Sequence, residues 1–598
     1  MLATTRPELV GDFGMVASTH WLASAAGMSA LERGGNAADA AAISAFVLQI
    51  VEPHLCGPAC DVPILVWDDE VGQVTVICGQ GVAPQAATTK RFADLGLEVM
   101  PGTGLLPAVV PGAFGAWTLL VERYGSWTLR EILEPAISLA ERGHPLLAAV
   151  STAVSGVADM FRNAWPTSAA TWLPGDQVPE PGSRFKNPVL ASTYRRIVSE
   201  AEARTPDRAG QFEAARDVWY RGFVAEEIDS FCAENEFLDT SKRAHHGLLT
   251  GQDLADWEPT FETPVSFDYQ QYTVYKPGPW SQGPVFLQQL ALLANTDIAA
   301  MEHQSADWVH TIVEASKLAF ADREAWYGDP RFSDVPLLDL LSLTYNKERA
   351  RLIGSQASYD QRPGSPGGRA PALPRQRTAP HVGDSQAAAG VGEPTVAAHV
   401  SGDKTGDTCH IDTVDRTGLM VSATPSGGWL QSSPTIPSLG FCLGTRGQMF
   451  WLEDCLPNSL RPGARPRTTL SPSMALRDGK PYLAFGTPGG DMQDQWTLHF
   501  FLNVVHGQQS NLQRSIDSPD FHSLHTASSF YPRLAFPGRV VIEDRYDPAT
   551  IAELRRRGHH VELRDGWSLG RVSAVARDGE WLKAAANART AQGYAAGR

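Results

Sequence analysis

Thr408 stands at a point of the chain that suits covalent chemistry. It opens a strand-like run, residues 408–414, directly after a segment with few large apolar residues. A threonine hydroxyl is a poor nucleophile unless a base lies beside it. Cleavage before Thr408 would supply that base, because a free α-amine has a pKa of about 7.7–8.0 and can take up a proton near neutral pH. Most threonines at strand starts have no chemical role, so the junction alone only suggests a nucleophile.

Other residues that could do chemistry lack the spacing that a site requires. Cys56 and Cys60 have no second cysteine or histidine pair at zinc spacing. The run Gly486–Gly490 lacks the lysine and hydroxyl residue that end a phosphate-binding loop, and we find no nucleophile elbow of the α/β-hydrolase kind. The histidine pairs at 245–246 and 559–560 are surrounded by polar residues in the sequence, and we expect them to be exposed to solvent. We therefore predict neither a metal nor a cofactor.

Helices with strands between them are predicted over the first 350 residues. Trp21–Leu31 has the pattern of a helix, and Asn36 with Asp39 can cap a second helix that continues to Ile50. Ser305 is the expected N-cap of a further helix. Strands are expected at residues 64–67, 74–77 and 272–275.

Composition changes twice after this region, which predicts three parts. Residues 1–354 form the α/β region, and residues 355–407 are rich in Gly, Pro, Ala, Ser and Gln, which is typical of a flexible linker. Residues 408–598 form a β-rich region. Its hairpins are indicated by turn residues between apolar runs, at residues 415–418, 478–479 and 578–579.

The overall composition limits the classes of function. The chain has 598 residues, 43% apolar and 19% charged, with a net charge of −16. No basic block is present, so nucleic acid is not an expected partner. Seven cysteines do not make a disulfide framework for a chain of this size. The N-terminus lacks the pattern of a secretory signal, and the longest apolar stretch, residues 40–51, is too short to span a bilayer, so we expect a cytoplasmic protein without a membrane partner.

A series of ordered motifs runs along nearly the whole chain. They are residues 30–41 (ALERGGNAADAA), 51–53 (VEP), 110–112 (VPG), 220–222 (YRG), 247–254 (GLLTGQDL), 314–323 (EASKLAFADR), 328–330 (GDP), 465–466 (RP), 471–472 (SP) and 486–490 (GTPGG). With these motifs the chain resembles the γ-glutamyltransferase family of N-terminal-nucleophile hydrolases.

The resemblance implies an α+β fold, a four-layer αββα sandwich formed jointly by a large and a small chain after autocleavage between Asp407 and Thr408. Thr408 matches the family's nucleophile, and Ser426 matches a hydroxyl residue that supports it. Gly489 and Gly490 match the backbone amides of the oxyanion hole. Thr468 and Thr469 match paired serines that contact the substrate's carboxylate.

Three positions depart from the family's glutamate site. Gln80 stands where members that bind glutamate have an arginine for the α-carboxylate. Trp451, after the pair Gln448-Met449, stands at the acidic position that meets the α-ammonium, and Gly428 replaces an asparagine. Glutamine cannot replace an arginine–carboxylate pair in charge. Arg446 is close enough in sequence to be a substitute for the missing charge.

The sequence thus predicts an autoprocessed amidohydrolase or acyltransferase that acts on a small-molecule amide with a non-glutamyl acyl group. We expect a neutral, partly aromatic pocket, with Trp429, Phe450 and Trp451 near one another. A true γ-glutamyltransferase or glutathione hydrolase is the alternative. An inactive member that acts as a binding or scaffold protein is the second alternative. The sequence leaves open whether the two chains assemble into a higher homo-oligomer.

Overall fold

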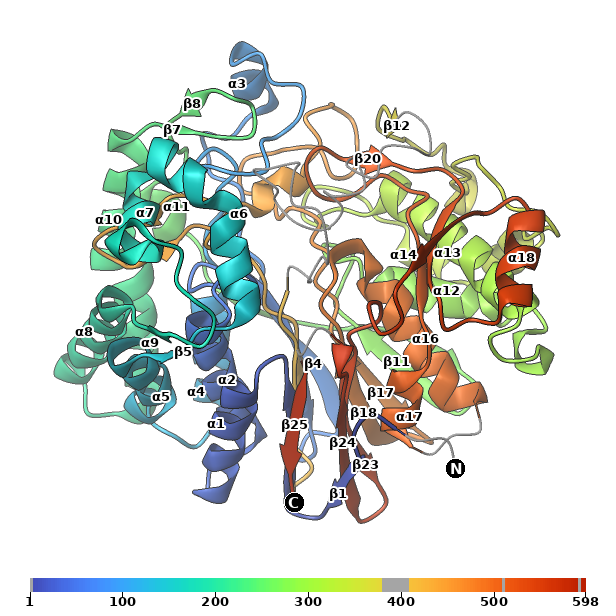
Figure 1. The fold of residues 1–598 in the computed structure, drawn as a ribbon, viewed down its shortest axis with the longest axis horizontal. Coiled ribbons are helices and arrows are strands. Elements are labelled where there is room, and N and C mark those ends of the chain that lie inside the picture. The colour runs from blue at the N-terminus through green and yellow to red at the C-terminus, as the bar shows by residue number, and fades with distance from the viewer. Residues whose placement is uncertain (1–3, 379–407, 508–510, 590–592) are drawn as a thin grey trace.

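Two seven-stranded sheets face each other at the centre of the molecule, and helices cover the outer face of each (Figure 1). A computed structural model describes residues 4–378, 408–507, 511–589 and 593–598. The side chains between the sheets are apolar and buried, among them Met15, Trp67, Met474 and Val575. This arrangement confirms the αββα sandwich that the resemblance implied.

Both sheets are antiparallel throughout, and each mixes strands from before and after residue 408. The first sheet runs β25 (Tyr594–Gly597), β2 (Gly14–Ser18), β13 (Ile411–Asp415), β14 (Met420–Ala423), β3 (Val62–Asp68), β4 (Gln73–Gly79) and β9 (Thr260–Glu262). The second runs β1 (Leu9–Gly11), β24 (Trp581–Ala586), β23 (Ser573–Asp578), β18 (Lys480–Gly486), β17 (Ser473–Arg477), β11 (Tyr272–Lys276) and β10 (Val265–Tyr269). The regions before and after residue 408 therefore share both sheets and one fold.

Two groups of helices form the outer layers. The larger group, beside the first sheet, comprises α1 (Trp21–Glu32), α2 (Ala37–Val51), α4 (Ala113–Tyr124), α5 (Leu129–Arg142), α6 (Ala148–Ala164), α7 (Pro166–Trp172), α8 (Pro188–Arg204), α9 (Arg208–Tyr220) and α10 (Phe223–Glu234). The group beside the second sheet comprises α12 (Pro284–Leu293), α13 (Ala306–Trp326), α15 (Leu343–Ala350), α16 (Gln493–His506), α17 (Leu512–Asp517) and α18 (Pro548–Arg556). The shorter helices are α3 (Thr89–Asp94), α11 (Gly251–Ala255) and α14 (Leu337–Leu340).

Small sheets complete the fold at its periphery. They pair β19 (Phe521–Ser523) with β21 (Arg539–Glu543) and β22 (His560–Arg564), β12 (Arg377–Thr378) with β20 (Leu534–Ala535), β15 (Thr435–Ile436) with β16 (Phe441–Cys442), β5 (His144–Pro145) with β6 (Arg184–Phe185), and β7 (Phe237–Leu238) with β8 (Ala244–His245).

The predicted local signals are confirmed. Asn36 and Asp39 form a capping box at the start of α2, and the Ser305 side chain accepts a hydrogen bond from the backbone of Trp308. Asp478 and Gly479 both have positive φ, +52° and +74°, as the two-residue hairpin between β17 and β18 requires. These signals act within a few residues, so the sequence alone could give them.

The prediction of a flexible linker over residues 355–407 is wrong for its first part. Residues 355–378 pack onto the fold, although they have few large apolar side chains; one of them, Leu373, packs against the hydrophobic core beside the second sheet. The Gly364 N–H donates to Asp322, and Arg362 pairs with Glu314 at 2.8 Å. Buried acids on α13 thus anchor the segment together with these few apolar contacts. Residues 379–407, which include the predicted cleavage residue Asp407, lie outside the described residues.

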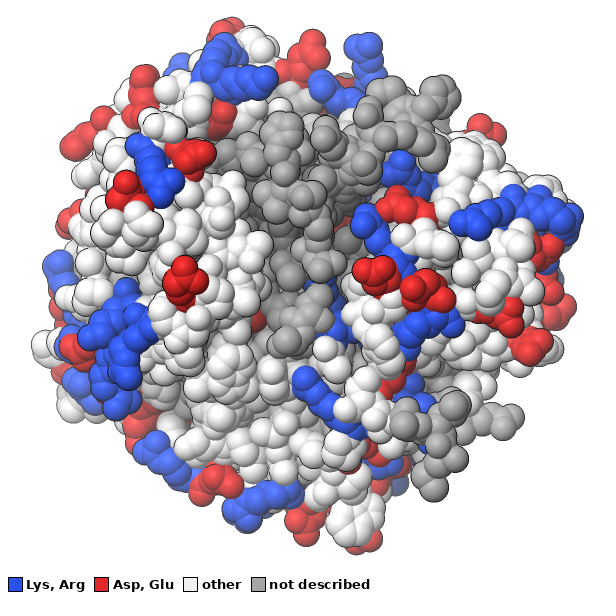
Figure 2. All heavy atoms as spheres, in the orientation of Figure 1, with Lys and Arg blue, Asp and Glu red and all other residues white. Residues whose placement is uncertain are grey.

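Charged side chains are interspersed on the face shown in Figure 2, where acidic and basic residues alternate and no basic patch gathers. Within the described chain, every helix is too short or too polar to cross a membrane.

Candidate functional site

Thr408 lies buried just before β13, and its hydroxyl meets that of Ser426. Thr408 Oγ1 donates a hydrogen bond to Ser426 Oγ over 3.2 Å. Ser426 follows β14 and is fixed by two backbone bonds with Asp61, of 2.9 and 3.0 Å. The neighbouring β13 and β14 hairpin thus brings the two hydroxyls together, as the sequence predicted.

The thiols around Thr408 are neutral. Cys409 Sγ lies 3.3 Å from Glu52, and burial raises the pKa of Cys409 to about 11. Cys56 and Cys60 lie in the same buried group with their sulfurs 3.5 Å apart, and burial raises the pKa of Cys56 well above its usual value. A thiolate is the reactive form of cysteine. At neutral pH, the hydroxyl of Thr408 therefore has no competing thiolate in Cys409.

His410 connects the start of β13 with the end of β18 in the opposite sheet. Its ring bonds Thr424 and Asp412, each over 2.9 Å. On the other side the ring lies against Gly486, where an added Cβ would come within 2.2 Å of it. Gly489 follows three residues later. Thr408 and the predicted oxyanion-hole glycines therefore lie at the same end of the two facing sheets.

The glycine pair has a backbone conformation that other residues rarely adopt. Gly489 has a φ of +130° and Gly490 a φ of +54°. A Cβ on Gly489 would lie 2.4 Å from the ring of Trp496. In the described part of the chain, neither N–H donates a hydrogen bond to a protein group. Free N–H groups are what an oxyanion hole offers.

A buried network fixes this glycine loop. Gln282 Nε2 donates to the Gly490 carbonyl over 3.1 Å, and Arg323 donates to Gln282 Oε1 over 2.7 Å. Arg323 also pairs with Asp491 at 2.6 Å. Sequence reasoning missed Gln282, because only long-range packing brings it to the loop.

Thr468 and Thr469 lie beside the same network. The Thr468 carbonyl accepts from the Gln282 N–H over 2.9 Å, which links the threonine pair to the glycine loop. Thr469 Oγ1 is buried and has no hydrogen-bond partner among the described residues. A buried hydroxyl without a partner is costly unless a ligand completes it, which fits the substrate contact predicted for this pair.

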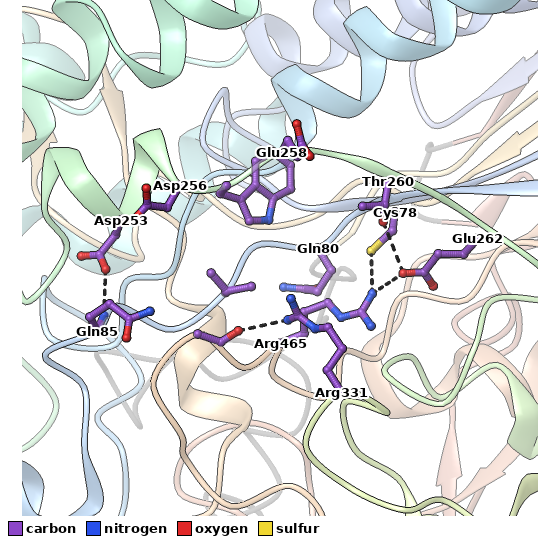
Figure 3. Close-up of a pocket in the computed structure, with 13 residues that line it drawn as sticks. Cys78, Gln80, Gln85, Asp253, Asp256, Glu258, Thr260, Glu262, Arg331 and Arg465 are labelled. Atoms are coloured by element: carbon purple, nitrogen blue, oxygen red, sulfur yellow. Dashed lines mark hydrogen bonds and ion pairs between the residues drawn. The ribbon is translucent and has the colours of Figure 1, made fainter.

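Gln80 lies at the end of β4 and lines a polar cavity of about 420 Å³ (Figure 3). Its Nε2 donates to the Gly81 carbonyl over 3.2 Å, and its buried Oε1 has no partner within the described chain. Arg465, on the cavity wall, is held by Glu262 and Asp329. Arg331, which also lines the cavity, pairs with Asp329 as well. The cavity thus has two arginines already paired with acids and a glutamine where a charge was expected.

Asp61, which the sequence analysis missed, joins Gln80 to the nucleophile's support. Its Oδ1 accepts from the Gly81 N–H over 3.0 Å, and its Oδ2 lies 3.4 Å from Arg446 Nε. Burial raises the pKa of Asp61 to about 6, although Arg446 and hydrogen bonds from Gly81 and Gln80 oppose the rise. The only signal in the sequence was an acid inside an otherwise apolar run.

The predicted neutral aromatic pocket is wrong. Trp429, Phe450 and Trp451 belong to three separate hydrophobic clusters. Arg533 lies over the Trp451 ring at 3.6 Å, and Arg446 faces the Trp429 ring at 5.5 Å. Both tryptophans are buried, and each has a guanidinium over its ring face.

Gln448 and Gly428 have structural contacts. The Gln448 amide bonds Gly102, Thr445 and the backbone of Tyr531. Gly428 has a φ of +61°, and its carbonyl lies so close to Gly57 that a Cβ there would clash at 2.1 Å. The structure therefore gives Gln448 a role in holding its loop, while its contact with a substrate stays a prediction.

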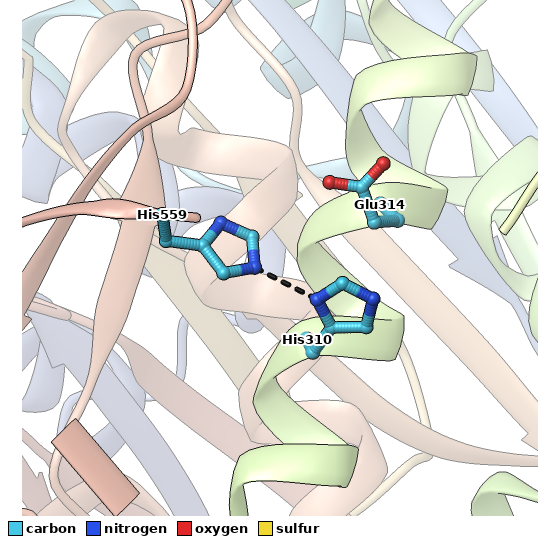
Figure 4. A group of neighbouring side chains, drawn as sticks. All are labelled: His310, Glu314 and His559. Carbon is cyan, nitrogen blue, oxygen red and sulfur yellow. Dashed lines mark hydrogen bonds between the residues drawn. The ribbon is translucent and has the colours of Figure 1, made fainter. Parts of the chain in front are cut away.

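The buried side chains of His310, Glu314 and His559 have the donor atoms of a metal site (Figure 4). They are distant from Thr408 in the sequence. His310 Nδ1 lies 2.8 Å from His559 Nε2, and Glu314 stands one turn along α13. Glu314 already pairs with Lys317 and Arg362. These cations disfavour a metal ion, so we assign the group to hydrogen bonding.

The same group corrects the expectation that the histidine pairs are solvated. His559 is buried, and so is His245, which bonds Asp239 over 2.7 Å. The second member of each pair, His246 and His560, is exposed.

Comparison with known proteins gives consistent matches. The sequence model described as Gamma-glutamyltranspeptidase matches residues 23–597. The glutathione hydrolase-like YwrD proenzyme of Bacillus subtilis is 30% identical, with 96% of each chain covered. The oxamate amidohydrolase proenzyme of Klebsiella pneumoniae is 30% identical, with 98% of this chain and 99% of the relative covered. The solved structure of LmbA2991HD is 52% identical with a TM-score of 0.93, and both chains are covered completely.

Proposed function

Because the chain belongs to the gamma-glutamyltranspeptidase family and is an enzyme of the N-terminal-nucleophile type, we propose that it is a self-processing amide hydrolase whose nucleophile is Thr408. The observation that carries the proposal is the bond between Thr408 Oγ1 and Ser426 Oγ. The bond lies at the N-terminal end of β13 in the first sheet, and Gly489 and Gly490 follow β18 in the opposite sheet.

The proposed reaction begins with maturation. The Thr408 hydroxyl attacks the preceding carbonyl, the acyl group moves from nitrogen to oxygen, and water hydrolyses the ester. The freed α-amine then takes the proton from Oγ1 as that oxygen attacks the substrate's amide carbon. The Gly489 and Gly490 N–H groups receive the oxyanion. The leaving amine takes up the proton, and water releases the acid from the acyl-enzyme.

We propose a non-glutamyl acyl group as the substrate. Gln80 and Trp451 stand in place of two charge partners, and the Trp451 ring is already occupied by Arg533. The relatives support more than one substrate, since one is glutathione hydrolase-like and another is an oxamate amidohydrolase.

Two alternatives are kept. A γ-glutamyltransferase or glutathione hydrolase would need Arg446 to replace the missing arginine, and the burial of Arg446 near Asp61 favours testing this. An inactive binding protein is disfavoured, because the hydroxyl pair and the free glycine N–H groups are both kept.

The test is a denaturing gel of purified protein with N-terminal sequencing. Wild type is expected to give two bands of about two thirds and one third of 64.6 kDa, the smaller beginning at Thr408. Thr408→Ala is expected to give one uncut band without amidase activity. Wild-type protein that remains full length and still hydrolyses amides would contradict the proposal.

A further inference from the structure

Arg446 stands out among the buried arginines because its donors are largely unused. Arg446 Nε lies 3.4 Å from Asp61, Nη1 reaches only the Met449 sulfur at 3.9 Å, and Nη2 has no partner within the described residues. A charge-assisted bond of this kind normally measures 2.7–2.9 Å. The guanidinium is nevertheless 1% exposed.

Other buried arginines of this chain are well satisfied. Arg323 makes charge-assisted bonds of 2.6–2.8 Å to Asp491 and Glu324. Arg589 donates to the carbonyl oxygens of Ile516 and Ser518 over 2.6 Å each. Single unpartnered guanidinium nitrogens also occur at Arg465 and Arg533, but these two side chains make several other hydrogen bonds. At Arg446 only the long contact with Asp61 and the distant Met449 sulfur remain, and the cost of this burial points to a missing anionic partner.

The unused donor faces the nucleophile's support. Arg446 Nη2 lies 3.5 Å from the position of a Cβ on Gly427, and the same position is 3.7 Å from Asp61 Oδ2. Gly427 has no side chain, and this position lies at ordinary contact distance from Arg446, Asp61 and Cys60. Ser426, beside Gly427 in the chain, bonds Thr408. A group placed there is one residue away from the hydroxyl pair.

We propose that Arg446 binds a carboxylate on the acyl part of the substrate, and that Asp61 holds the arginine until substrate arrives. This inference rests on the proposed function, because it places the acyl group at Thr408. The acyl class is a short dicarboxylic acid bound through one carboxyl as the amide and through the other to the guanidinium. No ammonium is needed, which agrees with the glutamine and tryptophan at positions 80 and 451.

The long contact between Arg446 and Asp61 is what we expect if a substrate carboxylate replaces Asp61 as the partner of Arg446. Burial outweighs the arginine in setting the pKa of Asp61, which lies at about 6. A pair built only for stability would be expected to lower that pKa. A substrate carboxylate that adds a bidentate contact to Nη1 and Nη2 would compete with little loss.

The experiment compares anilides of oxalic, malonic, succinic and glutaric acid with neutral acyl anilides of equal length. Wild type is expected to prefer at least one acidic anilide. Arg446→Gln is expected to lower kcat/KM on that anilide about ten- to hundredfold, with little change on its neutral match. Asp61→Asn keeps the acceptor for Gly81 and removes the competing charge, so it is expected to raise the acidic-to-neutral ratio. Arg589→Lys controls for loss of a buried guanidinium.

Equal losses on acidic and neutral anilides in Arg446→Gln would overturn the inference and leave a structural arginine. A lower ratio of kcat/KM on acidic to neutral anilides in Asp61→Asn would overturn the inference as well. If Arg446→Gln does not fold, the result with Asp61→Asn decides. Inhibition of neutral-anilide hydrolysis by free succinate is a further readout, expected to weaken in Arg446→Gln. Failure of the proposed function would look different, since the chain would stay uncut or hydrolyse no anilide. Preference for γ-glutamyl anilide, lost in Arg446→Gln, would keep the carboxylate site and reject the non-glutamyl substrate.

Discussion

Thr408 Oγ1 and Ser426 Oγ lie 3.2 Å apart in a buried setting, so the oxygen that we propose as the nucleophile is held by a second hydroxyl. Ser426→Ala removes the acceptor and is expected to lower kcat about ten- to hundredfold, because a buried hydroxyl left unpaired costs about 1–3 kcal/mol. Initial rates on a neutral anilide measure this. Ser44→Ala, which removes a buried bond to the Ala23 carbonyl, is the control. Equal rates in wild type and Ser426→Ala would remove Ser426 from the site.

Gly489 is expected to tolerate no side chain. Gly489→Ala should lower kcat by about 10²–10³, the usual loss for an oxyanion donor, because its Cβ would strike Trp496 and turn the loop. Gly479→Ala is the matched control, since Gly479 also has positive φ but its Cβ would meet open space. If Gly479→Ala loses as much activity as Gly489→Ala, the effect is general strain.

The γ-glutamyl group is expected to be a poor acyl donor. Its ammonium has no acidic partner at position 451, and one unpaired charge costs about 1–3 kcal/mol, so γ-glutamyl-p-nitroanilide should react about ten- to hundredfold more slowly than the matching anilide without the ammonium. Gln80→Arg with Trp451→Asp should recover part of this. The gain is limited because the new aspartate would pair with Arg533. A wild-type preference for the γ-glutamyl compound would favour the glutathione hydrolase alternative.

Activity is expected to rise with pH through the neutral range. The base is the α-amine of mature Thr408, with a reference pKa of about 7.7–8.0 that burial lowers. The measurement is kcat/KM between pH 4 and 9 on a neutral anilide, on which Arg446 has no charge to bind. A rising limb near pH 4 would indicate a carboxylate base instead.

Stability is expected to fall on acidification because of His559. Burial lowers the pKa of His559 to about 3. Between the unfolded value of about 6.5 and pH 3, the unfolded chain binds a proton that the folded chain refuses, so stability is present above pH 6.5 and is lost by about 1.4 kcal/mol per pH unit below it. His559→Gln should reduce the difference between urea midpoints at pH 7.5 and 5.5. Exposed His246→Gln should not, and an unchanged difference in His559→Gln would contradict the assignment.

The sequence could predict those features that depend on residues close together in the chain. The caps at Asn36 and Ser305 and the hairpin at Asp478 depend on residues a few positions apart, and they are confirmed. Arg446 and Asp61 are 385 residues apart, so no local pattern could pair them. The anchoring of residues 355–378 was missed for the same reason, because distant acids can hold a segment that has few apolar side chains.

Because both sheets contain strands from before and after residue 408, folding has to precede autocleavage. β13 lies between β2 and β14, and β17 lies between β18 and β11, so strands from before and after residue 408 are hydrogen-bonded neighbours in both sheets. Ser426 is held by backbone bonds to Asp61, and Gly489 follows β18 of the opposite sheet, so the proposed site is complete only once both sheets are assembled. We therefore expect the precursor to fold before it cuts itself. The two products are then interlocked, and dilution should not separate them. After denaturation, the two fragments of the mature enzyme are no longer joined in one chain. We therefore expect activity to return on refolding of the uncut precursor, and not on refolding of the separated fragments.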